Sequence, residues 1–234
     1  MLPKLANVYN PTRVYPNPVW LASPKLDGIR CLYYADKGLT SRSQKQRYIG
    51  FGEIEQICDS LRISNNLSFL DGELYIPGEK FDVISGIVRD TKDYDVSAKA
   101  RVEFRVFAVG SIANSNMTAE SMLDLMKSAL SDTGRVNYLP HSVIPNTPIA
   151  VQTEAELVKS SGRSDEGIML RNPSSVYPST LYQIKVNRIC FHCFQAPNIT
   201  SLAPCVTILT PCIMNQAPCI TSLTLCIMMK TYFY

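Results

Sequence analysis

Apolar positions along the first 188 residues recur with two spacings, which predict a mixture of strands and helices. Four runs rich in aromatic and β-branched residues, each bounded by turn-forming residues, predict strands. They are RCLYYA (30–35), FLDGELYI (69–76), VEFRVFAVG (102–110) and EGIMLRN (166–172). Helices do not regularly connect one strand to the next. The pattern therefore predicts an α+β fold whose sheets are antiparallel-rich and flanked by helices, rather than a doubly wound parallel sheet.

Three segments between these runs have the apolar spacing of a helix that packs on a sheet. Segment 51–62 places Ile54, Ile57, Cys58 and Leu61 on one face, and segment 118–130 does so with Met122, Leu125, Met126 and Ala129. The third, TEAELVKSSG (153–162), is predicted to begin at a capping box of Thr153 and Glu156 and to end at Gly162.

The last part of the chain, 189–234, differs in composition from the first 188 residues. From Ala196 it repeats every seven residues, and proline recurs at positions 197, 204, 211 and 218. Proline at each repeat excludes a coiled coil and disfavours a membrane-spanning helix. Two interpretations remain: an apolar segment that is β-rich or disordered, and the translation of a tandem DNA repeat after a frameshift. We favour the frameshift because the repeat has no polar face, and we expect two domains, 1–188 and 189–234.

Charge and cysteine content narrow the class of protein only a little. The formal net charge is +3, which gives no support for a strongly basic nucleic-acid protein, and Lys230 is the only charged residue after Arg188. Six of the eight cysteines lie in the tail, and Cys190, His192 and Cys193 lack the second ligand pair of a zinc site. The first residues contain no apolar signal segment, so we expect a cytoplasmic protein, or one of the host-cell interior if the source is viral.

The stretch SPKLDGIR (23–30) places Lys25, Asp27 and Arg30 close together around Gly28. A lysine amine attacks phosphorus only when unprotonated, and at neutral pH that state costs on the order of 4 kcal/mol for a free lysine. Burial and a nearby cation such as Arg30 lower this cost. We expect Asp27 to steer the ammonium or a metal, and Gly28 to permit a close approach of the backbone to a ligand. Taken alone, the cluster is equally well explained as a surface group of ion pairs.

Further motifs favour the catalytic interpretation. In chain order they are KLDGIR (25–30), SRSQKQR (41–47), FLDGELYI (69–76), FRVFAVG (104–110), DEGIMLR (165–171) and YQIKV (182–186). Together they resemble the motifs of the covalent nucleotidyltransferases, and most closely those of ATP-dependent DNA ligases of the small viral and phage type. The resemblance covers residues 1 to about 186 and implies a ligase-type nucleotidyltransferase domain, ATP-grasp-like in fold.

The resemblance also implies roles for individual residues. Lys25 would be the nucleophile that becomes adenylylated, and Lys185 would contact the α-phosphate. Ser23 would recognise adenine, Phe107 would stack on it, and Arg42 would contact the ribose or the nick phosphate. The other nucleotide-binding residues would be Asp27, Arg30, Glu73 and Glu166, with Glu166 and Glu73 also binding Mg²⁺. The implied ligands are ATP and nicked duplex DNA, the implied processes are DNA repair, replication and recombination, and we expect a monomer without membrane association.

Three departures from the family pattern favour a second interpretation, a ligase remnant with weak or no activity. Gln183 stands where the family has a second lysine, and the spacing from Glu166 to Lys185 is shortened. The oligonucleotide-binding barrel that normally follows is not recognisable in 189–234. A third interpretation is a messenger-RNA capping guanylyltransferase, which shares the K-x-D-G pattern but lacks the MLR ending of EGIMLR. RNA ligases are less similar, because their lysine motif generally lacks an arginine at the position of Arg30.

Overall fold

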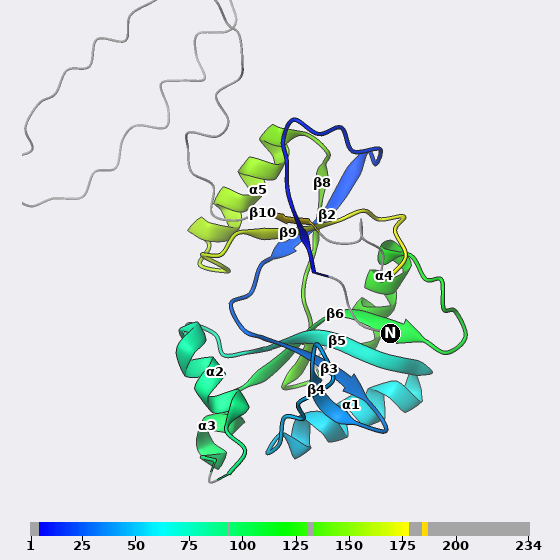
Figure 1. The fold of residues 1–234 in the computed structure, drawn as a ribbon. Coiled ribbons are helices and arrows are strands. Elements are labelled where there is room, and N and C mark those ends of the chain that lie inside the picture. The colour runs from blue at the N-terminus through cyan, green and yellow to red at the C-terminus, as the bar shows by residue number, and fades with distance from the viewer. Residues whose placement is uncertain (1–4, 93, 131–132, 178–183, 187–234) are drawn as a thin grey trace, which may run out of the picture. The chain divides into compact units, whose positions relative to one another are not determined.

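The computed structural model describes residues 5–92, 94–130, 133–177 and 184–186. The strands and helices of this part form two five-stranded sheets with helices packed on them (Figure 1). Expectations that concern Gln183, the domain boundary after residue 188, the seven-residue repeat and the missing barrel lie outside the described residues.

The first sheet has the strand order β1-β10-β9-β2-β8. Its strands are β1 (Asn7–Val8), β2 (Val19–Pro24), β8 (Ser142–Pro145), β9 (Ile168–Arg171) and β10 (Ile184–Val186). Helix α5 (Pro148–Ser160) packs against β2, β8 and β9, so that Val151 and Val158 join Trp20 in a small core.

The second sheet has the order β4-β3-β5-β6-β7 and carries the larger core. Its strands are β3 (Ile29–Tyr34), β4 (Gly38–Ser41), β5 (Leu67–Tyr75), β6 (Glu103–Ser111) and β7 (Val136–Tyr138). Helix α1 (Gly52–Ser64) contacts β5, α4 (Ala119–Ala129) contacts β6, and α2 (Phe81–Arg89) contacts β3, β5 and α3 (Val96–Ala100).

Within the described strands, only the pairings β1 with β10 and β6 with β7 are parallel. The other pairings in both sheets are antiparallel, which confirms the predicted antiparallel-rich α+β class. The four predicted strands correspond to β3, β5, β6 and β9. Segments 51–62 and 118–130 form α1 and α4, which bury their predicted apolar faces completely or in part. The likeness to ATP-grasp folds stays a prediction.

The predicted start of the third helix is wrong. Helix α5 begins at Pro148, and the Thr147 hydroxyl accepts a hydrogen bond from the backbone N–H of Ala150. Thr147 is therefore the N-cap, and Pro148 follows at the position where its missing N–H costs nothing. Thr153 lies inside the helix. The predicted end is confirmed, since the helix stops before Gly162, whose φ of 68° suits glycine.

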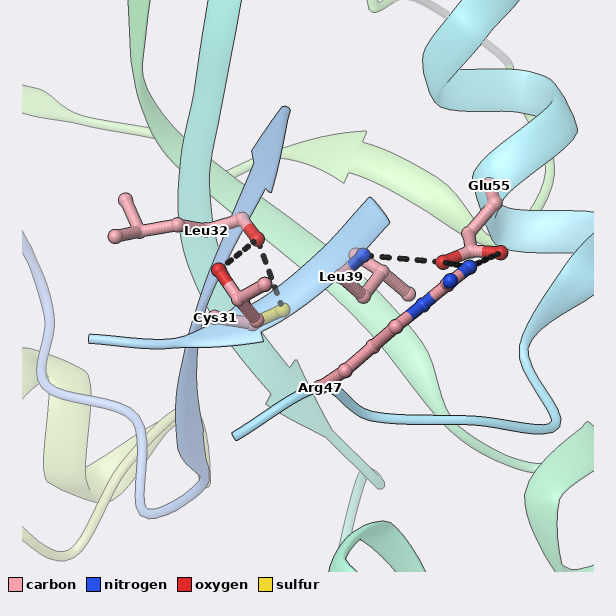
Figure 2. A network of polar contacts seen from close by, with 6 residues as sticks. Cys31, Leu32, Leu39, Arg47 and Glu55 are labelled. Carbon is pink, nitrogen blue, oxygen red and sulfur yellow. Dashed lines mark hydrogen bonds and ion pairs between the residues drawn. The ribbon is translucent and has the colours of Figure 1, made fainter. Parts of the chain in front are cut away.

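A polar network fixes the loop after β4, which belongs to the SRSQKQR motif. The Glu55 carboxylate of α1 accepts a hydrogen bond from the backbone N–H of Leu39 at 3.0 Å and is paired with Arg47 at 3.4 Å (Figure 2). Because Leu39 lies in β4 and Arg47 follows the loop, one carboxylate ties both sides of the loop to α1.

Candidate active site

The Lys25 segment joins the two sheets, since β2 ends at Pro24 and β3 begins at Ile29. The backbone N–H of Lys25 donates to the carbonyl of Gly167 at 3.0 Å, and the Ser164 hydroxyl donates to the carbonyl of Lys25. The Lys25 ammonium lies 3.0 Å from Glu166 Oε2, and the lysine side chain is 26% exposed. The turn before β9 therefore holds both the backbone and the amine of Lys25.

A cavity of about 430 Å³ opens beside this lysine, and we call it the Lys25 cavity. Its charged lining residues are Lys25, Asp27, Arg30, Glu73, Arg171 and Lys185. Its apolar lining includes Leu26, Phe81, Phe107, Leu139 and Met169. Four cations beside an apolar wall suit a ligand that combines a ring with a polyanion.

Glu73, on β5, is the acidic side chain most strongly perturbed by this environment. Burial raises its pKa to about 8; the cations Arg30 and Lys25 oppose the rise, and the carboxylates Asp71 and Asp27 add to it. The side chain keeps partial exposure because it faces the Lys25 cavity, although protein atoms surround it. The cavity thus contains a carboxyl group that is costly to ionise until a ligand or cation arrives.

Arg30 lies directly opposite Glu73 in the β3–β5 register but pairs with Asp71, its diagonal neighbour. Arg30 Nε donates to Asp71 Oδ1 at 3.0 Å, and Nη2 donates to Oδ2 at 2.7 Å. Asp71 is 0% exposed, and its Oδ2 also accepts the hydroxyl of Tyr177 at 2.7 Å. Burial opposes the charge of Arg30, yet Asp71 holds the pKa of Arg30 above its ordinary value.

Phe107 is placed by an irregularity in β6. In the β5–β6 pairing Gly72 is opposite Val106 while Asp71 is opposite Ala108, so Phe107 is the extra residue of a bulge. A bulge redirects a side chain. The guanidinium carbons of Arg30 and Arg171 lie 5.1 Å and 5.2 Å from the centroid of the Phe107 ring. The ring lines the Lys25 cavity and is otherwise buried in the core of the second sheet, and its stacking on adenine stays a prediction.

Arg171 lines the Lys25 cavity, although the motif resemblance implies no role for it. It ends β9 and the quoted DEGIMLR motif, it is 2% exposed, and Nη1 of its guanidinium contacts Nε2 of His141. Burial first, and then the charge of Arg171, lower the pKa of His141 well below its usual value. The imidazole is therefore neutral at pH 7. The signal that could have identified Arg171 was its charge at the end of an apolar strand.

Three predicted site residues do not line the Lys25 cavity: Ser23, Arg42 and Glu166, the last of which lines another cavity but contacts the Lys25 amine. Ser23 lies in β2 opposite Met169, and its buried hydroxyl has no hydrogen-bond partner among the described residues. Arg42 follows β4 in the loop that Arg47 and Glu55 anchor. The structure thus groups Lys25, Asp27, Arg30, Glu73, Phe107, Glu166 and Lys185, and places Ser23 and Arg42 apart from the cavity wall.

The structure gives Gly28 a reason to be glycine in addition to the expected approach to a ligand. A Cβ atom at this position would lie 2.5 Å from the Leu74 carbonyl oxygen and 2.8 Å from Glu73 Cγ. Gly28 also lines the Lys25 cavity, but the close approach that requires glycine is to β5. The residue therefore sets the position of Glu73 relative to the lysine segment.

Asp27, Glu73 and Glu166 are the acidic residues around Lys25 that could contribute to a metal site. In the part of the chain that the structure describes, no three His, Cys, Asp or Glu side chains converge closely enough to form a metal site. The raised pKa of Glu73, to which Asp27 contributes, indicates that a cation would stabilise the ionised carboxylate. These residues fit a Mg²⁺ ion that takes its remaining oxygen ligands from water and substrate phosphates.

Solved structures show which proteins share this fold. A Lig E DNA ligase, which binds DNA with a minimal scaffold, matches with a TM-score of 0.59 and 23% identity, over 80% of this chain and 68% of that one. The Chlorella virus DNA ligase-adenylate matches with a TM-score of 0.61 and 20% identity, over 80% and 69%. An archaeal ATP-dependent RNA ligase matches with a TM-score of 0.52 and 16% identity, over 79% and 47%.

No protein-family model and no curated protein matches the chain. The structural matches show that the described residues have the fold of ATP-dependent DNA ligases, in agreement with the resemblance seen in the motifs. Because an RNA ligase shares it, the fold does not by itself separate DNA from RNA substrates. None of the described helices has the length and apolarity needed to cross a membrane.

Proposed function

We propose that this chain is the nucleotidyltransferase domain of an ATP-dependent DNA ligase and that Lys25 forms a covalent adduct with AMP. The observation that carries the proposal is the position of Lys25, which lines the Lys25 cavity and whose amine lies 3.0 Å from Glu166 Oε2. A lysine at the wall of a cavity that holds three further cations has the arrangement needed to attack a bound triphosphate.

In the first step Lys25 Nζ gives up a proton and attacks the α-phosphorus of ATP. A P–N bond forms to the lysine, the P–O bond to the leaving group breaks, and pyrophosphate departs. Glu166 Oε2 is positioned to accept the proton from Nζ. Arg30, Arg171 and Lys185 line the cavity where negative charge develops on the phosphates, so their fixed charges stabilise the transition state.

Recognition of the nucleotide is assigned to the remaining residues that the motifs single out. Phe107 offers a ring to the adenine, and Glu73 accepts a hydrogen bond from the ribose or contacts the metal. In the ligase pattern Ser23 acts on the adenine, and Arg42 acts on the ribose or the nick phosphate. Neither residue lines the Lys25 cavity in this structure. Mg²⁺ held by Glu166, Glu73 and Asp27 would neutralise charge on the phosphates.

In the second and third steps the AMP is transferred to the 5′-phosphate at a nick, and the neighbouring 3′-hydroxyl then displaces AMP to seal the strand. The DNA ligases that share the fold support this substrate. Arg30 also supports it, since the RNA ligase pattern generally lacks this arginine, and its bidentate pairing with Asp71 holds it at the cavity.

Two other candidate functions predict different experimental results from a DNA ligase. A capping guanylyltransferase would form a GMP adduct on the same lysine. A ligase remnant would bind nucleotide or nicked DNA and transfer AMP slowly or not at all, because Gln183 replaces a lysine and no barrel is recognisable in the sequence.

The test is to incubate the purified chain with Mg²⁺ and either α-labelled ATP or α-labelled GTP. We expect a covalent AMP adduct, no GMP adduct, and loss of the label in Lys25→Ala. A GMP adduct would instead identify a capping enzyme. Two DNA substrates separate the steps: a nicked duplex supplied with ATP, and a duplex that is already adenylylated at its nick. If the chain seals only the pre-adenylylated duplex, the defect lies in lysine adenylylation, and the ligase-remnant interpretation is favoured.

A further inference from the structure

We infer that Tyr177 is a positioning residue that orients Arg30 in the Lys25 cavity through Asp71. The inference rests on the proposed function, because it gives Arg30 a nucleotide to contact. Tyr177 lies outside every motif that the sequence singled out, and it is separated from Asp71 by 106 positions in the chain. Its hydroxyl nonetheless donates to Asp71 Oδ2 at 2.7 Å.

The Tyr177 side chain is held from two directions. Its segment pairs with the start of α4, where the backbone N–H of Ala119 donates to the Ser175 carbonyl at 2.9 Å and Thr118 forms a β-bridge with Val176. Its ring packs 5.3 Å from the ring of Phe69 on β5. A hydroxyl on a ring fixed in this way has little freedom to leave its acceptor.

Asp71 transmits this constraint because both of its oxygens are engaged. Oδ1 accepts from Arg30 Nε, while Oδ2 accepts from Arg30 Nη2 and from Tyr177. Without the tyrosine hydroxyl, the buried carboxylate would rotate to recover its lost hydrogen bond and would carry the guanidinium plane with it.

The orientation of that plane matters for the Lys25 cavity. The pair with Asp71 uses one N–H of Nε and one of Nη2, so Nη1 is the nitrogen of Arg30 that has no hydrogen-bond partner among the described residues. The guanidinium also lies against Phe107, at 5.1 Å from the ring centroid. Tyr177 thereby sets both the direction of the donor that Arg30 offers to a nucleotide and the contact of Arg30 with the ring expected to receive the base.

The test compares Tyr177→Phe with Tyr34→Phe in the full chain. Tyr34 is the matched control, since its ring also packs on Phe69, at 5.9 Å, and its hydroxyl contacts Gln44 rather than Asp71. We expect Tyr177→Phe to raise the KM for ATP in lysine adenylylation roughly tenfold, the loss that fits one charge-assisted hydrogen bond, with kcat changed less than about twofold. Tyr34→Phe should change neither constant.

Equal constants for the two variants would overturn the inference, and so would a fall in kcat at unchanged KM, since that result reports only a smaller folded fraction. If the unmodified chain forms no AMP adduct, the proposed function fails. The role of Tyr177 is then tested separately by nuclear magnetic resonance, which measures how fast the Arg30 Nε–H proton exchanges with solvent. The signal is assigned by its loss in Arg30→Lys. Faster exchange in Tyr177→Phe than in Tyr34→Phe supports the positioning role, and equal exchange refutes it.

Discussion

Asp71 and Glu73 lie two positions apart on β5, but the surroundings of their carboxyl groups differ: one is in the protein interior and the other is at the Lys25 cavity. Asp71 is fully buried, and both of its oxygens accept hydrogen bonds from Arg30 or Tyr177. Glu73 faces the Lys25 cavity, and burial raises its pKa to about 8. The protein therefore pairs the first carboxylate with its own side chains and leaves the second facing the cavity, where its ionised form is costly.

The largest effect on stability is expected from breaking the buried pair with Asp71→Asn. The change leaves the Arg30 charge without its partner, and we expect a loss of about 3 kcal/mol in the free energy of unfolding, the low end for such pairs because Arg30 reaches the cavity. Urea unfolding measures it. The control is Glu53→Gln, whose exposed carboxylate pairs with Arg135 at 2.7 Å and whose loss should cost less than about 1 kcal/mol. Equal losses in both variants would contradict the structural role given to Asp71.

A smaller loss is expected when the spacing between Glu73 and the lysine segment is disturbed by Gly28→Ala. The new methyl group would meet the Leu74 carbonyl at 2.5 Å, and overpacking of this kind costs roughly 1–3 kcal/mol. Gly86→Ala is the matched control, because Gly86 lies inside α2 with open space around it and the change should stabilise the protein by about 0.5–1 kcal/mol. If Gly28→Ala is neutral in urea unfolding, the close contact with β5 does not constrain this residue.

The smallest effect concerns Glu73 and depends on pH. The folded-state pKa of about 8 lies above the ordinary value of 4.5, so the folded protein binds more protons than the unfolded chain between these values. Folding stability from this group is present at low pH and is lost as pH rises through that window. Glu73→Gln removes the loss, so relative to the unmodified chain it should gain roughly 1–2 kcal/mol between pH 5 and pH 8.5, reduced by solvent in the cavity. If the difference in unfolding free energy between Glu73→Gln and the unmodified chain stays constant with pH, Glu73 ionises with an ordinary pKa.

Much of the fold followed from local patterns in the sequence. The strands β3, β5, β6 and β9 have dense aromatic and β-branched runs, and α1 and α4 have helical apolar faces, so each element was predicted from its own residues. The start of α5 was missed because Thr153 and Glu156 match a capping box, whereas the structure uses Thr147 as the N-cap with Pro148 at the first helical position. Helix α2 was missed as well, since Gly86 lies in the middle of its short apolar pattern.

Part of the candidate site could also be predicted from the sequence, and part could not. The motif resemblance implies one nucleotide site for Lys25, Glu73, Phe107 and Lys185, and all four residues line the Lys25 cavity. The hydrogen bonds of Asp71 with Arg30 and Tyr177 were not predicted, since they join residues 41 and 106 positions apart. Such contacts depend on strand register and on the bulge at Phe107, neither of which leaves a local signal in one sequence.

The most direct test of the account is to locate the AMP group by peptide mapping and tandem mass spectrometry after incubation with ATP and Mg²⁺. The account predicts AMP on Lys25, which lines the cavity and whose amine pairs with Glu166. AMP on Lys185, or on the buried structural Lys99 whose amine donates to the carbonyls of Ile49 and Asp90, would contradict it. So would an unmodified Lys25 in a chain that demonstrably binds ATP.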